Sequence, residues 1–516
     1  MKKGMTILLC CLISCVFAIV LVSPSVVDPN NTDWVINGGG DYLQHYLGWR
    51  YFREAPWSRQ FLFMRNLNYP VGTSVIVTDS NPLFCLIFKG LSPLLSADFQ
   101  FNGIWLVFSY TLLGLFACLC AWKMTADPVF SFLTVGWVLV NPVILQRAMI
   151  HDTLTAHWLI LAAFWLLLER RQKWNAFGWG ILVCLTMLIH AYFMPMIAWV
   201  LALQLLFDLQ DHRRAVDIII PVFVFLLAFI GSYVFFGYRY IEGQSGSYGE
   251  LSLNLNAFLD PDGTSLFLKD RVHFPLQYEG FNYWGLGLLI LFPFPLCLLP
   301  RVGWKRLTVA FFPLILLILL AAGNEGTFDL ISLWSIELPE RLQTFLSVFR
   351  SSGRLVWPLY YAAVLTALYS LRNRKLLGLC VMAALMILQW ADLNPCVQDV
   401  FTRFRLPVNT LPEVDASFDS LSEGKQALFV SDGASKEIDA FALYAVEHHM
   451  RFNRGTNARG IKPIYDGEMA DLSSLTCDNI SSDSIYVFMD PNDLPESCEG
   501  CTETIGSYSV LRSADR

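Results

Sequence analysis

The residues DWVINGGGDYLQHYLGWRYFREAPW (33–57) follow directly on the first apolar segment and place carboxylates, arginines and a histidine among aromatic side chains. Three consecutive glycines at 38–40 allow a tight backbone turn just before Asp41. From Tyr42 onward the aromatic residues recur at helical spacing, which predicts an aromatic-faced helix at a membrane surface. Polar groups at that depth are costly unless they serve a site or face water. We therefore expect this stretch to form part of a functional site.

The composition of the whole chain indicates a membrane protein. Of its 516 residues, 55% are apolar and 15% are charged, and the mean hydropathy is +0.48. Soluble proteins carry about 25% charged residues, so the deficit favours a chain that crosses the bilayer several times. The net charge of −7 gives no reason to expect a nucleic-acid partner.

We predict a polytopic α-helical membrane protein with about eleven transmembrane helices and a cytoplasmic N-terminus. Every short loop that this arrangement places inside contains Lys or Arg, as the positive-inside rule requires. The N-terminal apolar run is long for a signal peptide and no clear cleavage site follows it, which indicates an uncleaved first helix. The expected helices span about 5–23, 101–122, 128–147, 156–169, 175–190, 193–208, 215–237, 284–300, 307–322, 354–371 and 376–391.

This arrangement divides the chain into a transmembrane domain at 1–391 and an extracytoplasmic domain at 392–516. Three long loops lie on the same side as the tail. The segment Pro82–Leu95 is apolar but too short to span, so we expect it to be re-entrant or to lie at the membrane surface. The long loops cover 24–100, 238–283 and 323–353.

The tail is polar and contains two short strand-like runs, at 427–431 and 484–489. Between them, residues 437–448 form an amphipathic pattern with a helical period. A strand–helix–strand order predicts a small α/β domain.

Polar and ionisable side chains gather at the predicted helix ends on the outer side, whereas the inner loops contain little except basic residues. A site is therefore expected at the outer boundary between membrane and water. The candidate residues are Asp33, Asp41, Gln44, His45, Asp79, His151, Glu279, Arg350 and Arg354.

Five motifs together resemble a known superfamily of enzymes. They are GGGDYLQHYLGWRYFREAPW (38–57), TDSNPL (78–83), HDTLTAHWLIL (151–161), EGFNYWGLG (279–287) and FRSSGRLVWPLYY (349–361). The chain looks like GT-C membrane glycosyltransferases, and more closely like an uncharacterised bacterial family of GT-C-like membrane proteins. The resemblance spans most of the chain. It implies a polyprenyl-phosphate-linked sugar donor, an acceptor such as a lipid-linked glycan or cell-surface polysaccharide, and a place in the bacterial cytoplasmic (inner) membrane.

In inverting GT-C enzymes an Asp of the first outside loop acts as general base on the acceptor hydroxyl, so the resemblance implies this role for Asp41. A base must lie within hydrogen-bond reach of the hydroxyl group, with about 2.6–3.2 Å between the two oxygen atoms. Asp41 could instead cap the following helix, for which Asp is a favoured type, and Asp33 is the second candidate for the base. Asp79 is either a turn residue or part of an acceptor site.

The leaving phosphate needs cations near the membrane plane, and the forked guanidinium group of Arg suits that task. Arg350 and Arg354 flank a Ser-Ser-Gly turn at the outer boundary, where the alternative is contact with lipid headgroups. Glu279 stands beside aromatic residues, which suits sugar binding but is also the composition of an interfacial belt. Gln44, His45 and His151 complete the predicted substrate-binding set.

We expect neither a metal nor a cofactor. The histidines at 151 and 157 do not share a helical face, and Asp260-Pro-Asp262-Gly263 indicates an ordinary turn rather than a metal motif. Cys498 and Cys501 could form a redox pair, a zinc half-site or part of an extracytoplasmic disulfide, with Cys477 as an available partner. The disulfide fits best, because no second ligand pair completes a zinc set.

Two other function classes stay open: a transporter or flippase of a lipid-linked glycan, and a non-catalytic envelope assembly protein. Transporters place ionisable residues at the membrane midplane, often in two related halves. Here the ionisable residues lie at one boundary and no paired halves are detected. The leading prediction is a glycosyltransferase.

Overall fold

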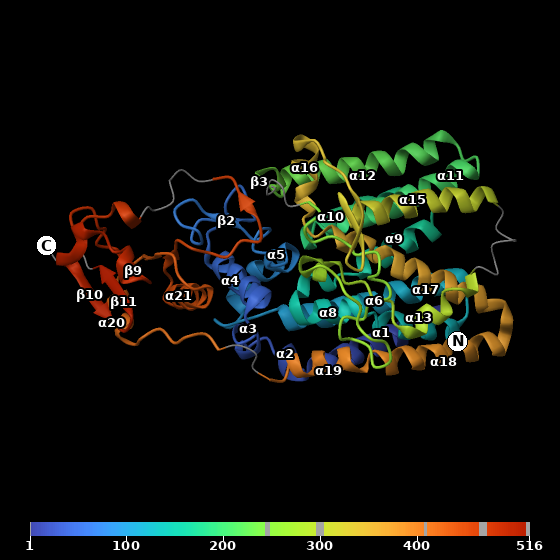
Figure 1. Ribbon diagram of the computed structural model, residues 1–516, viewed down its shortest axis with the longest axis horizontal. Helices are drawn as coiled ribbons and strands as arrows, with labels where there is room; N and C mark the ends of the chain where they lie inside the picture. The colour runs from blue at the N-terminus through green and yellow to red at the C-terminus, as the bar shows by residue number, and fades with distance from the viewer. Residues whose placement is uncertain (1, 243–247, 296–303, 407–409, 464–471, 512–516) are drawn as a thin grey trace. The chain divides into compact units, whose positions relative to one another are not determined.

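The computed structural model describes residues 2–242, 248–295, 304–406, 410–463 and 472–511 (Figure 1). The chain is mostly helical and forms two compact units. Unit 1 contains Met1–Pro29, Phe101–Tyr233 and Gly243–Leu406, and unit 2 contains Asn30–Gln100, Val234–Glu242 and Pro407–Arg516. The long segment after the first helix therefore folds together with the C-terminal residues, although it was predicted as a loop of the transmembrane domain.

Unit 1 is built mainly from apolar helices joined by short turns. Its helices are α1 (Lys3–Val22), α2 (Pro24–Val27), α6 (Asn102–Thr125), α7 (Pro128–Leu139), α8 (Pro142–Ile150), α9 (Trp158–Leu168), α10 (Asn175–Ile189), α11 (Phe193–Gln210), α12 (Ala215–Phe235), α13 (Leu286–Leu291), α15 (Trp304–Ala322), α16 (Glu340–Leu346), α17 (Trp357–Leu371), α18 (Lys375–Asp392) and α19 (Asn394–Arg403). Strands β4 (Glu325–Phe328) and β5 (Ile331–Ser335) form an antiparallel hairpin. Short 3-10 helices include η2 (Asp152–Thr155), η4 (Pro275–Gly280), η6 (Ser347–Phe349), η7 (Ser352–Val356) and η8 (Arg372–Arg374).

Within the described residues, four helices are long and apolar enough to cross a membrane: α1, α6, α11 and α12. The number rises to six if each of the bent pairs α7–α8 and α18–α19 is one span. The prediction of about eleven spans is therefore not supported. Helices do form in the predicted segments, but α9 has 11 residues and α10 has 15, whereas a span needs about 20. The end of the predicted helix at 284–300 lies outside the described residues.

The predicted single helix at 128–147 is broken in two, with a bend of 47° between α7 and α8. The side chain of Asn141 accepts a hydrogen bond from the Val143 N–H and caps α8. Pro142 follows it at the first position of α8, where a missing N–H costs nothing but an unbroken helix could not continue. The chain beyond 391 also continues in unit 1, through α19, after a bend of 51°.

Helices α1 and α6 pack closely against each other (Figure 1). At Gly114 of α6, an added Cβ would lie 1.8 Å from the Ser14 hydroxyl of α1, so only glycine allows this approach. Small residues at helix contacts are typical of membrane proteins. Helix α12 exposes Phe223, Leu227 and Ile230 along its length. Apolar side chains of this kind are suited to contact with lipid.

Unit 2 contains a mixed five-stranded sheet in the order β10-β11-β9-β6-β7. Strand β6 pairs in parallel with β7 and β9, and β11 pairs antiparallel with β9 and β10. Its elements are α3 (Asp33–Ile36), α4 (Gly40–Glu54), β1 (Phe63–Met64), β2 (Thr73–Ser74), α5 (Pro82–Gly90), η1 (Ser92–Leu94), η3 (Tyr238–Tyr240), β3 (Ile241–Glu242), α20 (Ser417–Ser422), β6 (Ala427–Val430), α21 (Ser435–Glu447), β7 (Arg451–Phe452), β8 (Gly460–Ile461), η9 (Leu472–Ser474), β9 (Ser484–Phe488), η10 (Pro491–Asp493), η11 (Glu496–Cys501), β10 (Thr502–Ile505) and β11 (Tyr508–Leu511). The two predicted strands and the helix between them are thus confirmed as β6, α21 and β9.

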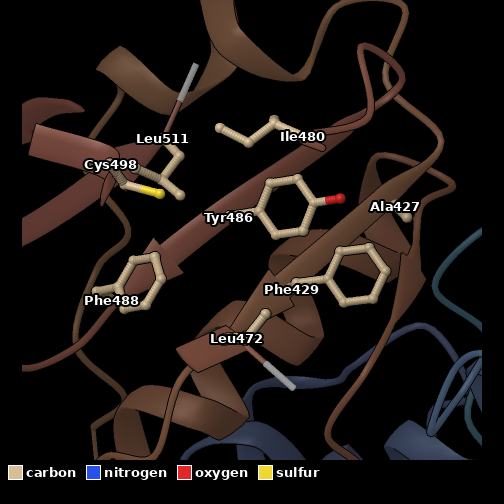
Figure 2. Close-up of a cluster of buried hydrophobic side chains, with 8 residues drawn as sticks. All are labelled: Ala427, Phe429, Leu472, Ile480, Tyr486, Phe488, Cys498 and Leu511. Atoms are coloured by element: carbon tan, nitrogen blue, oxygen red, sulfur yellow. The ribbon is translucent and has the colours of Figure 1, made fainter. Parts of the chain in front are cut away.

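Alternating apolar side chains of the sheet form a core on one of its faces (Figure 2). Phe429 of β6 and Tyr486 of β9 stack with ring centroids 5.0 Å apart. Buried Cys498 belongs to the same core, and next to it Cys501 forms a disulfide with Cys477. The predicted disulfide that includes Cys477 is therefore present, with Cys501 rather than Cys498 as its partner.

Candidate functional site

Helix α4 begins at Gly40, the last of the three glycines and two residues before the predicted start at Tyr42. Gly39 and Gly40 have φ angles of +60° and +56°, a left-handed conformation that glycine adopts without steric cost. Gly39 is the N-cap residue, and Asp41 lies half-buried in the first turn. Asp41 is therefore not the helix cap, although a carboxylate in the first turn still interacts favourably with the helix dipole. Asp33 is exposed in the short helix α3.

The middle of α4 borders a cavity of about 250 Å³ within unit 2. Gln44 lines this cavity and donates a hydrogen bond to the Thr78 carbonyl oxygen, at 3.3 Å. The opposite side consists of Asp439 from α21 and Arg454 and Thr456 from the segment after β7. Burial raises the pKa of the Asp439 carboxyl to about 6, against a hydrogen bond with Thr456 that lowers it. Gln44 lines this depression, and its role in substrate binding stays a prediction.

The charged residues in the second half of α4 hold the fold of unit 2. Arg53 donates hydrogen bonds to the carbonyl oxygens of Ser92, Leu95, Ser96 and Ala97. Arg50, which is 4% exposed, donates to Tyr46 and to the Asp98 carboxylate. Lys89 of α5 donates to the carbonyl oxygens of Phe52 and Ala55, which terminate α4. Burial lowers the pKa of the Lys89 ammonium group to about 8. These contacts position α4.

Two further predicted residues of unit 2 occupy constrained positions. His45 of α4 is buried, with 2% of its surface exposed. Asp79 is half-buried and has a φ of +54°, in the turn that leads to the Asn81 cap of α5. The Asp79 carboxylate lies close enough to Tyr238 to raise the pKa of its phenol, in addition to the larger effect of burial. The predicted turn at Asp79 is present, and its role at an acceptor site stays a prediction.

In unit 1 a buried ionic cluster, the Arg147–Glu279–Arg354 triad, joins three helix ends. Arg147 comes from the last turn of α8, Glu279 from η4, and Arg354 from η7 directly before α17. Arg354 contacts Glu279 Oε2 through Nε at 2.9 Å and Nη2 at 2.8 Å, and Arg147 Nη2 lies 3.0 Å from the same oxygen. The three residues are 1%, 8% and 8% exposed. Two guanidinium groups thus converge on one carboxylate, and the triad carries one net positive charge.

The electrostatics of the triad are set by its burial and its excess of arginine. Burial by itself raises the pKa of the Glu279 carboxyl, but the charges of Arg354 and Arg147 outweigh it and hold the pKa at about 2. Glu279 is therefore ionised at neutral pH. Among these three residues the two guanidinium groups outnumber the carboxylate, and such an excess of positive charge interacts favourably with an anion.

Aromatic and backbone groups fix the triad in place. The Arg354 guanidinium lies 5.0 Å from the ring centre of Tyr192, and that of Arg147 lies 5.8 Å from the ring of Trp357. The Tyr192 hydroxyl accepts a hydrogen bond from the Ser351 N–H, at 2.9 Å. Asn282 donates to the carbonyl oxygens of Gly280 and Gly353 and so ties η4 to η7. The arginine side chains are therefore held in one geometry before any ligand binds.

The other two predicted residues of unit 1, His151 and Arg350, lie close in sequence to the arginines of the triad but do not belong to it. His151 is buried at the end of α8, and its ring lies edge-on to that of His190 at 5.4 Å. Arg350 is exposed in the turn before η7. The structure thus joins Glu279 and Arg354 in one cluster, whereas the predicted pairing of Arg350 with Arg354 as a double phosphate clamp stays a prediction.

Several residues of the candidate site were not predicted from the sequence. Arg147, Tyr192 and Trp357 were not among the predicted site residues. The one available signal was position, because Arg147 and Tyr192 stand at predicted helix boundaries. The turn at 260–263 is confirmed, with the Thr264 N–H bonded to the Pro261 carbonyl oxygen and a φ of +79° at Gly263.

The fold and these sites define a helical protein with several apolar helices that could span a membrane, and with a small strand-containing C-terminal region. Residues 11–394 match a protein family described as "Domain of unknown function (DUF6311)". The match covers well over half of the chain, so this protein belongs to that family. No curated protein matches the chain.

Proposed function

We propose that this protein is a membrane glycosyltransferase of the GT-C type, which moves a sugar from a polyprenyl-phosphate-linked donor to an extracytoplasmic acceptor. The acceptor class is a lipid-linked glycan or a cell-surface polysaccharide. The motifs at 38–57, 78–83, 151–161, 279–287 and 349–361 support the superfamily by resemblance. The observation that carries the proposal is the Arg147–Glu279–Arg354 triad.

The triad suits the phosphate of a lipid-linked donor for three reasons. Its net positive charge is buried, so an anion gains more there than at an exposed site. Its arginines offer forked donors that match phosphate oxygens. Arg147 lies in the last turn of α8, which belongs to a bent apolar pair that could span a membrane, so its position is consistent with contact to the headgroup of a polyprenyl lipid.

The reaction assigns a different task to Asp41. Its carboxylate takes the proton of the acceptor hydroxyl while the hydroxyl oxygen attacks C1 of the donor sugar. The bond between C1 and the phosphate oxygen breaks, and polyprenyl phosphate leaves with the electron pair, which inverts the configuration at C1. Cations held in advance at the leaving phosphate stabilise the charge that develops on it. The reaction needs no metal in this scheme.

The proposed location is the bacterial cytoplasmic membrane, with a cytoplasmic N-terminus and an extracytoplasmic C-terminal domain. The disulfide between Cys477 and Cys501 supports this side for the tail, because disulfides persist in oxidising compartments. The basic residues of the inner loops support the same orientation.

The proposal is tested by the opposite effects of two substitutions in the triad. Native mass spectrometry of the purified protein measures the bound fraction of added undecaprenyl phosphate. Arg354→Gln removes the excess positive charge and should weaken binding about tenfold or more, since a charge-assisted hydrogen bond contributes about 1.5–3 kcal/mol. Glu279→Gln raises the net charge of the triad and should strengthen binding.

The exposed Arg341 of α16 provides a matched control, and Arg341→Gln should bind as the wild type does. Size-exclusion chromatography in detergent checks that each variant is folded. Equal binding by the wild type, Arg354→Gln and Glu279→Gln would remove the triad from the donor site.

A further inference from the structure

The hairpin β4–β5 and the helix α16 of unit 1 carry a group of exposed apolar side chains, the hairpin surface. Its members come from residues 330–345 and are between 43% and 68% exposed. They are Leu330, Ile331, Leu333, Ile336, Leu342 and Phe345. Single exposed apolar residues are ordinary, but a group of this size in one short segment marks an interaction surface.

Polar contacts hold the hairpin so that these side chains stay outside. Asp329, in the turn between the two strands, accepts hydrogen bonds from Arg271 Nη2 at 2.7 Å and from Asn256 Nδ2 at 2.6 Å. Thr327 of β4 accepts from Gln277 Nε2 at 2.8 Å. The hairpin is therefore a preorganised support, and its apolar side chains are presented in a fixed arrangement.

A β-bulge adds to the apolar exposure of the hairpin. Thr327 pairs with Ser332 and Gly326 with Trp334, so Leu333 between them has no cross-strand partner. Bulges bend a strand and re-aim the side chain of the extra residue. Leu333 is accordingly 52% exposed, although it belongs to a strand.

The hairpin begins level with the start of a helix that could cross a membrane. That helix is α11, and the hydroxyl of Tyr192 directly before it accepts a hydrogen bond from the Ser351 N–H at 2.9 Å. The hydroxyl of the next residue, Ser352, donates to the Ala321 carbonyl oxygen at 3.0 Å. Ala321 lies in the last turn of α15, and β4 follows soon after that helix. Because a span ends at the membrane boundary, the hairpin is expected at one boundary of the bilayer.

Apolar exposure continues from α15 into the hairpin. Deeper along the two helices, the Trp199 indole of α11 donates to the Pro313 carbonyl oxygen of α15 at 2.8 Å, so α15 lies beside α11 and runs in the opposite direction. Helix α15 exposes Phe312, Ile315 and Leu319 by 70%, 52% and 46%. Side chains of this kind beside a membrane span are suited to lipid, and the hairpin surface extends the same kind of face.

The charges near the hairpin surface indicate a lipid surface without a required charge. Leu342 and Phe345 of α16 are three residues apart and therefore lie on one face of the helix. The exposed Glu340 and Arg341 precede them. Acidic and basic side chains thus alternate instead of forming the basic cluster that anionic lipids attract. Apolar area is then the main source of affinity, as in helices that lie in the membrane interface.

We propose that the hairpin surface inserts into the boundary between headgroups and acyl chains of the bilayer that α11 crosses. Its partner is the lipid surface itself. The inference concerns membrane contact and does not depend on the proposed transfer reaction. Since η6 and η7 follow α16 closely, an inserted hairpin surface also holds Arg354 near the level of the lipid headgroups.

Photo-cross-linking of the full chain in proteoliposomes tests the inference. Ile331 and Phe345 are replaced one at a time by p-benzoylphenylalanine, which reacts with the C–H bonds of acyl chains. Phe223, exposed on α12, is the positive control, and Glu423, exposed after α20, is the negative control. The vesicles consist of phosphatidylcholine with or without phosphatidylglycerol, and mass spectrometry of the digested protein measures the lipid adducts.

We expect the probes at positions 331 and 345 to form lipid adducts about as often as the probe at 223. Their yield should exceed that at 423 by about tenfold or more, in both lipid compositions. Size-exclusion chromatography before reconstitution confirms that each variant is folded, and both hairpin positions are exposed enough to accept the probe.

The other outcomes overturn the inference or separate it from the proposed reaction. Adduct yields at 331 and 345 as low as that at 423 overturn it. Cross-links to a second copy of the chain in place of lipid overturn it in favour of self-association, and adducts that require phosphatidylglycerol overturn the apolar basis of the contact. Lipid adducts at both positions in a protein without transferase activity support the hairpin surface and refute only the proposed reaction.

Discussion

The Arg147–Glu279–Arg354 triad allows a quantitative prediction for Glu279→Gln. The Glu279 side chain is 11% exposed, and its pKa is held at about 2 instead of 4.5. Each pKa unit corresponds to about 1.4 kcal/mol, so ionisation of this carboxyl contributes about 3 kcal/mol to stability at neutral pH. The substitution leaves two buried guanidinium groups without their carboxylate, a change that typically costs about 3–5 kcal/mol. We expect Glu279→Gln to destabilise the protein by about 3 kcal/mol.

The assay is thermal unfolding in detergent, read by intrinsic fluorescence. A loss of about 3 kcal/mol corresponds to a fall of about 6 °C or more in the midpoint, from about 2–4 °C per kcal/mol for domains of 150–250 residues. Glu250→Gln is the matched control and should unfold as the wild type does. Undecaprenyl phosphate should raise the midpoint of Glu279→Gln more than that of the wild type, because the anion replaces part of the lost charge.

The pH dependence follows from the direction of the pKa change. The folded pKa of Glu279 lies below its unfolded value, so its contribution is fully present above about pH 4.5 and is lost as the pH falls through about 2. The difference in stability between the wild type and Glu279→Gln should therefore be smaller at pH 3 than at pH 7. A midpoint within 1 °C of the wild type at pH 7, with no change toward pH 3, would refute the electrostatic reasoning.

Two further predictions concern unit 2. Lys89→Met should destabilise unit 2 by about 1–3 kcal/mol, since it leaves the buried carbonyl oxygens of Phe52 and Ala55 without their donor. The exposed Lys462→Met is the control and should not change the stability. Hydrogen exchange of the α4 amides measures the difference. The double variant Cys477→Ser/Cys501→Ser should lower the stability of unit 2 by about 3 kcal/mol. In the wild type, alkylation of the unreduced protein under denaturing conditions should label Cys498 but neither Cys477 nor Cys501. Labelling of Cys477 in that experiment would contradict the pairing.

The sequence predicted local features well, because they depend on neighbouring residues. The glycines before Asp41 set the start of α4, and the short apolar runs of the tail located β6 and β9. Apolar runs placed helices correctly but overstated how many could cross a membrane. Length decides that question, and breaks such as the one at Asn141 shorten the helices.

Features that depend on distant residues could not be predicted. Glu279 was singled out for its aromatic neighbours, but nothing in the sequence pairs it with Arg147 on a helix far earlier in the chain. The association of the first long segment with the C-terminal region is of the same kind. It depends on contacts such as the hydrogen bond from the Tyr51 hydroxyl to the Ala442 carbonyl oxygen, at 2.8 Å.

The central claim is tested most directly by a transfer assay on the purified protein in proteoliposomes. Polyprenyl-phosphate-linked radiolabelled hexoses are supplied singly, with delipidated membrane glycans as acceptors, and labelled glycan and released polyprenyl phosphate are measured together. We expect both products from the wild type, and from the exposed-site variant Glu250→Gln. Asp41→Asn should lose about 10²–10⁴-fold in rate while it still binds undecaprenyl phosphate. Transfer by Asp41→Asn at the wild-type rate, or no glycosidic product from the wild type with any donor, would contradict the account.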